Sequence, residues 1–340
     1  MRRRGITVLV GAVLLVFLAW QTTVITVPYV AMGPGPTVDT LGVSDGKPVI
    51  SLTGAQKTTS KGQLRLVTIE VQPELTLFDA MRGWLAHDYA VVPKELIYPP
   101  DKSEKDVDQE NATAFHESQT SAETAALREL GYPVQVIVTE VAAGFDAGKV
   151  LAVGDTIDPV DGTKVTSLQK LTELVRGKPA GTARQVAFTH SGKPGAATIT
   201  TKKDDQGNPR LGVSVKEEQP HPFTLKIDLD KIGGPSAGLM FTLGIIDTLK
   251  AEDLTGGLII AGTGTIDEEG NVGPIGGIPQ KLVAAKAAKA KVFLTPAANC
   301  AEALDNPQPG LPLIKVSTLN DALNALTSLR AGQTPPLCSR

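Results

Sequence analysis

A serine in a glycine-rich turn, followed at once by a long apolar run, is the feature that most limits how this chain can fold. Residues 231–240 read KIGGPSAGLM, and the apolar run continues to Leu249. Proline suits the first turn of a helix because its missing N–H would have no partner there. The pattern predicts a helix N-terminus at Ser236, where free N–H groups and the helix dipole favour negative charge. This position suits a nucleophilic hydroxyl beside an oxyanion or, alternatively, a helix-capping serine.

The same turn also matches the nucleophile-elbow pattern of α/β-hydrolases, as Gly234-x-Ser236-x-Gly238. In that fold the catalytic acid and then the histidine follow the serine in the chain. All four histidines of this sequence precede the serine: His87, His116, His190 and His221. A nucleophilic Ser236 therefore needs a proton acceptor other than a downstream histidine.

Lys281 is the candidate for that acceptor. Residues 276–285 read GGIPQKLVAA, which after Pro279 is typical of an alanine-rich helix. At about 100° per residue, three alanines share the face of Lys281 and two later lysines do not. These residues are Ala284, Ala285 and Ala288, and Lys286 and Lys289. Burial lowers the pKa of a lysine, so the neutral amine can act as a base. The alternative is a solvated lysine at a helix start, because buried lysines are rare.

The two segments together resemble the proteolytic domain of the Lon-type proteases, which use a Ser-Lys dyad. The likeness rests on GPSAG at 234–238 and on GNVGPIGGIPQKLVAAKAAKAKVFLTPAAN at 270–299. The resemblance implies that Ser236 is the nucleophile and Lys281 the general base. It also implies an α+β fold for this part of the chain.

A third element of that family lies between the two. Its Thr-Gly-Glu motif matches Thr263-Gly264-Thr265 here, which implies that Thr263 supports the lysine amine. The sequence departs from the family at two positions, because Pro279 replaces its first lysine and Gly233 replaces an acidic residue. The second departure puts a carboxylate beside the dyad in doubt, but not the dyad itself.

The implied reaction is peptide-bond hydrolysis. Lys281 takes the proton of the Ser236 hydroxyl, and backbone N–H groups at Gly234 and Ala237 hold the oxyanion. These steps need no cofactor, whether a metal or a nucleotide. Lon itself couples proteolysis to ATP, but no GxxxxGK[ST] loop occurs in this sequence. We therefore expect ATP-independent cleavage of unfolded or membrane-associated protein substrates.

Composition bears on the number of domains and on whether the protein binds nucleic acid or a metal. A length of 340 residues predicts two or three domains, and 41% hydrophobic residues suffice for packed cores. A net charge of −3 gives no support for nucleic-acid binding. The sequence has neither a zinc-type cysteine spacing nor an HExxH motif, so it predicts no metal site.

An apolar run begins directly after the sequence MRRR. It extends from Gly5 to Trp20 and resumes at 24–27, so the 23 residues 5–27 are long enough to cross a bilayer. The preceding arginines predict a single-pass cell-membrane protein with a cytoplasmic N-terminus and an extracytoplasmic catalytic part. A cleaved signal peptide is the alternative, but no clear Ala-x-Ala site follows the run.

Two cysteines, Cys300 and Cys338, would then face an oxidising compartment in which they can pair. Cys338 lies in a Pro-rich tail, 331–340, which we expect to be mobile. Neither cysteine is expected to be a nucleophile, because no histidine follows either of them.

Residues 131–205 are predicted to form a separate β-rich module. Strands are expected at 133–138 and 150–162 and a hairpin at 185–201, with a helix at 168–175 capped by Ser167. The order of these elements and VGDTIDPVDG at 153–162 resemble PDZ domains of exported bacterial proteases. The resemblance implies that peptide C-termini bind as an added strand, with the carboxylate near Gly131, Tyr132, Pro133 and Val134. A PDZ-like spacer without a ligand is the alternative.

The protease-like segment 206–330 is short for a whole Lon proteolytic domain. The expected strand at 62–71 and helix at 114–130 resemble the elements that open that domain. We therefore expect an inserted PDZ domain within one Lon-like domain. The expected order is a cytoplasmic tail (1–4), a transmembrane anchor (5–27), the N-terminal part of the Lon-like domain (28–130), the PDZ domain (131–205), the proteolytic segment (206–330) and the tail (331–340). Within 28–130 we also expect a turn at 33–36, a helix at 76–89 and a mobile charged loop at 101–111.

Together these features predict a membrane-anchored serine endopeptidase whose substrates are recruited or gated by a PDZ domain. Lon domains form hexameric rings, so the resemblance implies a homo-oligomer. Two alternatives stay open. One is a catalytically silent, membrane-anchored PDZ scaffold, and the other is an enzyme that cuts only its own chain near residues 28–45.

Overall fold

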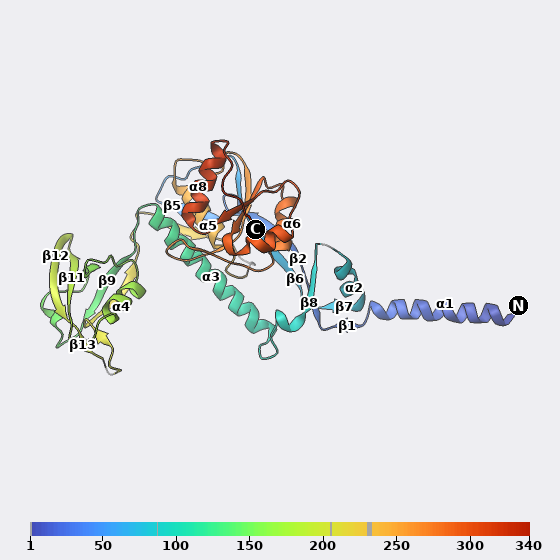
Figure 1. The fold of residues 1–340 in the computed structure, drawn as a ribbon, viewed down its shortest axis with the longest axis horizontal. Helices are drawn as coiled ribbons and strands as arrows, with labels where there is room; N and C mark the ends of the chain where they lie inside the picture. Colours follow the sequence, from blue (N-terminus) through green and yellow to red (C-terminus); the bar gives the residue numbers. More distant parts are fainter. Residues whose placement is uncertain (1, 87, 205, 230–232) are drawn as a thin grey trace. The chain divides into compact units, whose positions relative to one another are not determined.

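The computed structural model describes residues 2–86, 88–204, 206–229 and 233–340, with side chains from residue 6 onward. The chain divides into two compact units (Figure 1). Unit 1 consists of Met1–Ala126 and Thr224–Arg340, and unit 2 of Leu127–Phe223. The second unit therefore interrupts the sequence of the first.

A six-stranded mixed sheet forms the centre of unit 1. Its strand order is β21-β20-β17-β6-β2-β8, with parallel pairing from β21 to β6 and antiparallel pairing beyond. The strands are β2 (Tyr29–Asp39), β6 (Gln63–Gln72), β8 (Ala90–Pro93), β17 (Ile259–Gly262), β20 (Val292–Pro296) and β21 (Leu313–Val316). Because β6 precedes unit 2 and β17 follows it, the two flanks of the chain share one sheet.

Shorter strands pair around this sheet. The pairs are β1 (Thr26–Val27) with β7 (Leu75–Thr76), β3 (Val43–Ser44) with β4 (Lys47–Pro48), β5 (Ile50–Thr53) with β16 (Thr224–Ile227), and β18 (Thr265–Ile266) with β19 (Val272–Gly273). The pair of β5 and β16 again joins the two flanks. The strand β16 ends at Ile227, seven residues before the glycine of the serine turn, Gly234.

The described part of unit 1 also contains helices. They are α1 (Arg2–Thr22), α2 (Leu77–Leu85), α3 (Glu104–Glu129), α5 (Gly238–Leu249), α6 (Ile278–Ala287), α7 (Cys300–Asp305) and α8 (Leu319–Arg330), with the short 3₁₀ helices η1 (Lys94–Leu96) and η3 (Ala297–Asn299). The helix α5 is buried from Gly238 to Thr248, as expected for a helix that is apolar on all faces. It contacts β5, β6 and β18, while α6 packs on β2 and β6.

The charged segment expected as a mobile loop is instead helical, which corrects that prediction. The long helix α3 already begins at Glu104 (Figure 1). Ser103 Oγ donates to Asp106 Oδ2 at 2.7 Å and accepts from the Asp106 N–H at 3.2 Å. This reciprocal capping, with acidic residues in the first turn, stabilises a helix N-terminus without apolar contacts. The helix ends as predicted, with Gly131 at a φ of +87°.

The turn expected at 33–36 is also wrong, because Gly33, Pro34, Gly35 and Pro36 lie within β2. The pairing of β2 with β6 shifts register between Pro34 and Thr37. Such a bulge accommodates prolines, which have no N–H for the ladder. A Cβ on Gly35 would lie 2.4 Å from Thr68 Oγ1, so a glycine is required for the strands to approach this closely.

The C-terminal tail is held against the sheet, contrary to the mobile tail expected at 331–340. Cys300 and Cys338 form a disulfide with a Cα–Cα distance of 5.3 Å. The N–H of Cys338 donates to the Leu313 carbonyl at 2.8 Å, and that of Lys315 donates to the Pro336 carbonyl at 3.0 Å. The tail thus covers the edge strand β21, whose free backbone groups would otherwise face solvent.

The segment predicted as an anchor forms α1. Its apolar side chains are exposed, and examples are Val8, Leu15 and Val16. Within the part of the chain that the structure describes, no helix combines the length and the apolar character that crossing a membrane requires.

Unit 2 contains a five-stranded antiparallel sheet in the order β12-β11-β10-β9-β15. The elements of unit 2 are β9 (Gln135–Val141), η2 (Asp146–Lys149), β10 (Thr156–Val160), α4 (Leu168–Arg176), β11 (Ala183–His190), β12 (Lys193–Thr200), β13 (Lys202–Lys203), β14 (Pro209–Arg210) and β15 (Val213–Glu218). The strands β13 and β14 pair with each other outside the five-stranded sheet. Ser167 Oγ caps α4 by accepting from the Lys170 N–H at 3.0 Å, as predicted. Because β15 pairs along β9, the unit extends past residue 205 to Phe223.

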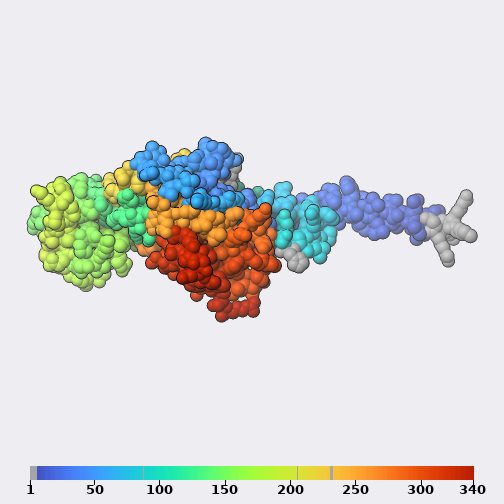
Figure 2. Space-filling model, turned by 90° about the horizontal axis from the view of Figure 1, so that it is seen from above, coloured from blue at the N-terminus to red at the C-terminus, as the bar shows by residue number. Residues whose placement is uncertain are grey.

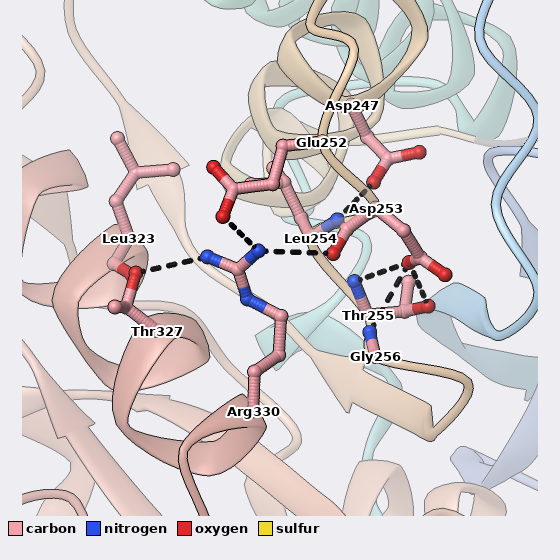
Figure 3. Close-up of polar contacts among 9 residues, drawn as sticks. All are labelled: Asp247, Glu252, Asp253, Leu254, Thr255, Gly256, Leu323, Thr327 and Arg330. Atoms are coloured by element: carbon pink, nitrogen blue, oxygen red, sulfur yellow. Dashed lines mark hydrogen bonds and ion pairs between the residues drawn. The ribbon is translucent and has the colours of Figure 1, made fainter.

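A polar network connects α8 to the loop after α5 (Figure 3). Asp247 is 1% exposed and accepts from the Leu254 N–H at 2.7 Å and from the Ser60 hydroxyl. Arg330 of α8 pairs with Glu252 and donates to the Asp253 carbonyl at 3.2 Å. The network therefore joins segments from both flanks of unit 2.

Candidate active site

Ser236 lies in a tight turn directly before α5. The helix begins at Gly238 and its N-cap is Ala237, which makes no side-chain capping bond. Ser236 is therefore not the helix cap, and its side chain is only half-buried. Gly234 has a φ of +83°, a conformation that glycine adopts without steric cost. The local sequence thus forms a turn that presents the serine at the edge of the core.

The helix α3 holds this turn in place. The N–H of Gly234 donates to the Asn111 carbonyl at 2.9 Å, and Ser118 Oγ donates to the Pro235 carbonyl at 2.9 Å. A Cβ on Gly238 would lie 2.9 Å from Ser118 Oγ, so the helix and the turn are in close contact. Sequence reasoning missed both α3 residues. The partners are more than a hundred positions from the turn, and Asn111 fell in the segment expected to be a loop.

Lys281 lies on the inner face of α6 and is 2% exposed. Ala284 and Ala285 of the same face are also buried, whereas Lys286 and Lys289 are exposed, as predicted. Lys281 Nζ donates to Thr263 Oγ1 at 3.0 Å. Desolvation by burial lowers the pKa of Lys281 from 10.5 to about 7. A large fraction of the amine is therefore neutral near neutral pH, as a general base must be.

Thr263 connects the lysine to the serine turn. The strand β17 ends at Gly262, and Gly264, with a φ of 153°, separates β17 from β18. The break directs Thr263 Oγ1 to the Ser236 carbonyl, to which it donates at 3.0 Å. The N–H of Gly264 donates to the same carbonyl at 2.9 Å. The predicted contact of Thr263 with Lys281 is present, and its second bond fixes the backbone of the serine.

The three residues therefore form one connected set. Among the described residues no hydrogen bond joins Ser236 Oγ to Lys281 Nζ directly, and Thr263 Oγ1 bridges the amine and the serine backbone. Catalytic hydrogen bonds are often long in unliganded enzymes and tighten only when substrate binds. The arrangement thus holds a lysine amine of lowered pKa and the backbone of the serine on one threonine hydroxyl.

The two residues expected to donate to the oxyanion, Gly234 and Ala237, differ in whether their N–H groups already have an acceptor. The N–H of Gly234 is already bonded to Asn111, so Gly234 serves the turn and not the oxyanion in this state. Within the described residues, the N–H of Ala237 has no hydrogen-bond acceptor. Ala237 therefore remains the candidate donor. The described residues also include no group of three or more His, Cys, Asp or Glu side chains that could hold a metal ion.

A second candidate site is a groove in unit 2 of about 370 Å³. It runs between α4 and β15, which lies at one edge of the sheet. Apolar side chains from both elements line it: Leu171 and Val175 from α4, and Val213 and Val215 from β15. An edge strand beside an apolar groove has the geometry required for an extended peptide to pair as a further strand.

The loop expected to hold the peptide carboxylate does not line this groove. Gly131 and Tyr132 instead end α3, where the Tyr132 N–H donates to the Leu127 carbonyl at 2.8 Å. The Tyr132 ring packs against Phe223 at 5.6 Å, and Pro133 and Val134 lead into β9. The turn at the groove is formed by residues 210–213, with Gly212 at a φ of +85°. A glycine before alternating apolar residues, LGVSV at 211–215, could have indicated this turn and strand in the sequence. The segment lies beyond residue 205, where the module was expected to end.

Residues 230–328 match the Lon protease (S16) C-terminal proteolytic domain. Lon protease of Phenylobacterium zucineum is 39% identical over 102 residues, which are 29% of this chain and 13% of that protein. Lon protease of Azospirillum brasilense is 41% identical over 93 residues, which are 26% of this chain and 11% of that protein. These similarities support a serine peptidase, and this chain spans only a small part of the length of these relatives.

About a quarter of the chain is similar to solved PDZ structures. The PDZ domain of an SdrC-like protein from Listeria monocytogenes is 28% identical and covers 24% of this chain and 85% of its own, with a TM-score of 0.23. The corresponding domain from Listeria innocua is also 28% identical and covers 26% of this chain and 98% of its own, with a TM-score of 0.23.

Proposed function

We propose that this chain is an ATP-independent serine endopeptidase that uses Ser236 as nucleophile and Lys281 as general base. The observation that carries the proposal is the buried Lys281, whose pKa is lowered to about 7 and whose amine contacts Thr263 at 3.0 Å. A buried lysine costs folding free energy, and a site that keeps one neutral beside a serine turn has a chemical use for it. The match of residues 230–328 to the Lon proteolytic domain supports the same assignment.

The proposed mechanism follows from the described contacts. Neutral Lys281 takes the proton from Ser236 Oγ as the oxygen attacks the scissile carbonyl, and the Ala237 N–H binds the oxyanion. The resulting ammonium then protonates the leaving amine, and a water molecule hydrolyses the acyl-enzyme. Thr263 Oγ1 bonds to both the Lys281 amine and the Ser236 carbonyl, so it keeps the base and the nucleophile next to each other through the reaction.

The groove between α4 and β15 is the proposed peptide-binding site of unit 2. Its edge strand supplies backbone hydrogen bonds, and its apolar lining accepts an apolar side chain. Peptide C-termini are the proposed ligands, and they would recruit a substrate or control its access to Ser236. We propose that the carboxylate of the peptide binds at the turn at 210–213 and not near Gly131, because the turn lines the groove.

Membrane attachment is proposed for α1. Its exposed apolar residues, such as Leu9, Leu15 and Val16, need an apolar environment, and lipid supplies one. The expected location, with the catalytic part on the extracytoplasmic side, stays part of this proposal. Assembly into a homo-oligomer is proposed from the family resemblance alone.

The catalytic proposal is tested with the full-length chain in detergent. Cleavage of an unfolded, fluorescently labelled protein is measured without ATP for the wild type, Ser236→Ala and Lys281→Met. Loss of cleavage in both variants, with unchanged circular dichroism, is expected. Cleavage that survives in either variant at the wild-type rate would exclude the dyad.

Active-site labelling separates a peptidase from a silent scaffold. A serine-directed fluorophosphonate should modify the wild type at Ser236 and leave Ser236→Ala unmodified. Lys286→Met is the matched control, because Lys286 lies on the exposed face of α6 and should not change labelling. A folded wild type that is not labelled and does not cleave would favour the scaffold.

The groove is tested by peptide binding. Thr172 lines the groove from α4 between two core residues, so Thr172→Trp should fill the groove without disturbing the core. A library of peptides with free C-termini should bind the wild type and lose affinity for this variant. Equal binding to both proteins would place the peptide elsewhere.

A further inference from the structure

The helix α2 presents an apolar face to solvent. We define this α2 face by four residues that are exposed despite their apolar side chains: Phe78 (48%), Met81 (39%), Trp84 (56%) and Leu85 (83%). The opposite side of the helix, with Ala80 and Gly83, is buried. The α2 segment lies at the surface in Figure 2, where it is cyan. A cluster of this size on a water-exposed surface indicates an interaction site.

The α2 face is fixed in position by its own contacts. Thr76 caps the helix through a capping box with Asp79, and a Cβ on Gly83 would lie 2.5 Å from a Val91 side-chain carbon. Close packing on β8 therefore sets the rotation of the helix. The apolar side chains point outward because the small residues Ala80 and Gly83 occupy the inner side.

The same contacts place α2 beside the end of α1. The N–H of Leu77, the first residue of α2, donates to the Ile25 carbonyl at 2.8 Å. The strands β1 and β7 pair with Thr26 opposite Thr76. Ile25 lies three residues after Thr22, where α1 ends. The C-terminal end of α1 and the α2 segment therefore lie close in the fold, although they are more than 50 residues apart in the sequence.

The chemistry of the α2 face favours lipid as its occupant. The exposed charged residue within α2 is Arg82, which complements anionic headgroups, while Asp79 bonds to the Thr76 hydroxyl at 2.6 Å. The Trp84 ring meets Tyr29 edge-on at 5.6 Å. Trp and Tyr concentrate at membrane–water interfaces, where an apolar ring with a polar edge fits the headgroup level.

We propose that the α2 face inserts into the headgroup–acyl boundary of the bilayer that α1 enters. The proposal rests on the proposed membrane attachment of α1. An amphipathic helix that lies in the interface needs only one apolar face, and it gains both apolar burial and electrostatic attraction to anionic lipids. The second contact would restrict the orientation of unit 1 against the bilayer.

The test uses the two tryptophans of the chain, Trp20 in α1 and Trp84 in α2. Trp20→Phe leaves Trp84 as the single reporter, and Trp84→Phe leaves Trp20. Both full-length variants are reconstituted into phosphatidylcholine–phosphatidylglycerol vesicles that contain either brominated or ordinary acyl chains. Strong quenching of Trp84 by brominated lipid, with a blue-shifted emission, is the expected result.

The outcomes separate this proposal from the attachment of α1. Quenching of Trp20 alone would overturn the lipid contact of α2 and leave the attachment of α1 intact. Quenching of neither tryptophan would overturn both. A blue-shifted but unquenched Trp84 would place a protein surface, such as a second copy of the chain, on the α2 face and would also overturn the proposal.

Two further variants check specificity in the Trp20→Phe background. Leu85→Asp adds a charge to the most exposed apolar position of the face and should lower the quenching of Trp84 severalfold without changing the circular dichroism spectrum. Arg82→Gln should lower the quenching only in vesicles with anionic lipid. Unchanged quenching in Leu85→Asp would contradict the insertion of this face.

Discussion

The pKa of Lys281 sets the expected pH dependence of catalysis. Burial lowers this pKa from 10.5 to about 7, and only the neutral amine can accept the serine proton. The kcat/KM for a peptide substrate should therefore rise about tenfold per pH unit below pH 7 and become constant above it. A pH–rate profile of the full-length chain measures this. A profile that keeps rising to pH 10 would contradict a base with a lowered pKa.

The same pKa makes a prediction for stability. The folded-state pKa of Lys281 lies below its unfolded value, so the unfolded chain binds more protons between about pH 7 and pH 10.5. Stability from this group therefore increases as pH rises through that window, and the full cost of charging the buried amine is present below it. Lys281→Met removes this cost, so the variant should be more stable than the wild type at pH 6 by about 1–4 kcal/mol.

Urea unfolding at pH 6 and at pH 10 checks this prediction. The advantage of Lys281→Met should become smaller at pH 10, because the amine of the unfolded wild type is then itself close to losing its proton and folding no longer has to remove it. Lys286→Met is the exposed control and should change the free energy of unfolding by less than about 0.5 kcal/mol. If the free energies of unfolding of Lys281→Met and the wild type differed equally at both pH values, the lowered pKa of Lys281 would be contradicted.

Thr263 is a positioning residue whose hydroxyl makes two bonds in the site. Thr263→Val keeps the shape but leaves the Lys281 amine and the Ser236 carbonyl without this partner. The loss is expected to cost about 1–3 kcal/mol, or roughly 5–160-fold in kcat. Thr263→Ser keeps the hydroxyl and should retain most of the activity. In Thr263→Val the apparent pKa of the pH–rate profile should also shift, which a purely structural role of the hydroxyl would not produce.

At the scale of elements, the polar network of Figure 3 connects the C-terminus of α8 to the loop after α5. Asp247 is the buried member, and burial raises the pKa of its carboxyl group. Asp247→Ala would leave the Leu254 N–H and the Ser60 hydroxyl without their acceptor. We expect a loss of about 1–3 kcal/mol in the free energy of unfolding, measured with urea at pH 7.

The control for this network is Glu252, which is exposed and pairs with Arg330. Glu252→Gln should change the free energy of unfolding by less than about 1 kcal/mol, because exposed ion pairs contribute little. The Asp247→Ala variant should keep the labelling of Ser236, since the network is separate from the dyad. If Asp247→Ala and Glu252→Gln lowered the free energy of unfolding equally, burial of Asp247 would not explain its contribution to stability.

For the whole molecule, the shared sheets predict how the chain responds to proteolysis. The two flanks of unit 2 are joined by the pairing of β6 with β17 and of β5 with β16. Limited proteolysis near residues 127 and 223 should therefore release unit 2 while fragments 1–126 and 224–340 stay together in size-exclusion chromatography. Fragments that separate without denaturant would show that the flanks fold independently.

Much of the local structure and the burial of Lys281 could be predicted from the sequence, because those signals are contained in short segments. The pairing of Ser236 with Lys281 as a catalytic dyad stays a prediction. The alanine face of α6 indicated that Lys281 is buried, and Ser167 indicated the start of α4. Hydrophobic periodicity and capping depend on neighbouring residues, so they can be read without knowledge of the fold.

Contacts between distant segments were decided only by the tertiary structure. The bonds of Asn111 and Ser118 to the serine turn, the second bond of Thr263 and the peptide groove beside β15 depend on elements brought together by the sheets. The helix at 104–111 and the bound tail were missed because charge and proline content suggested mobility, whereas capping and β21 ordered them. The sequence by itself thus determined which groups are the candidates for the chemistry, and the tertiary structure decided what holds them in place, because those partners are far apart in the chain.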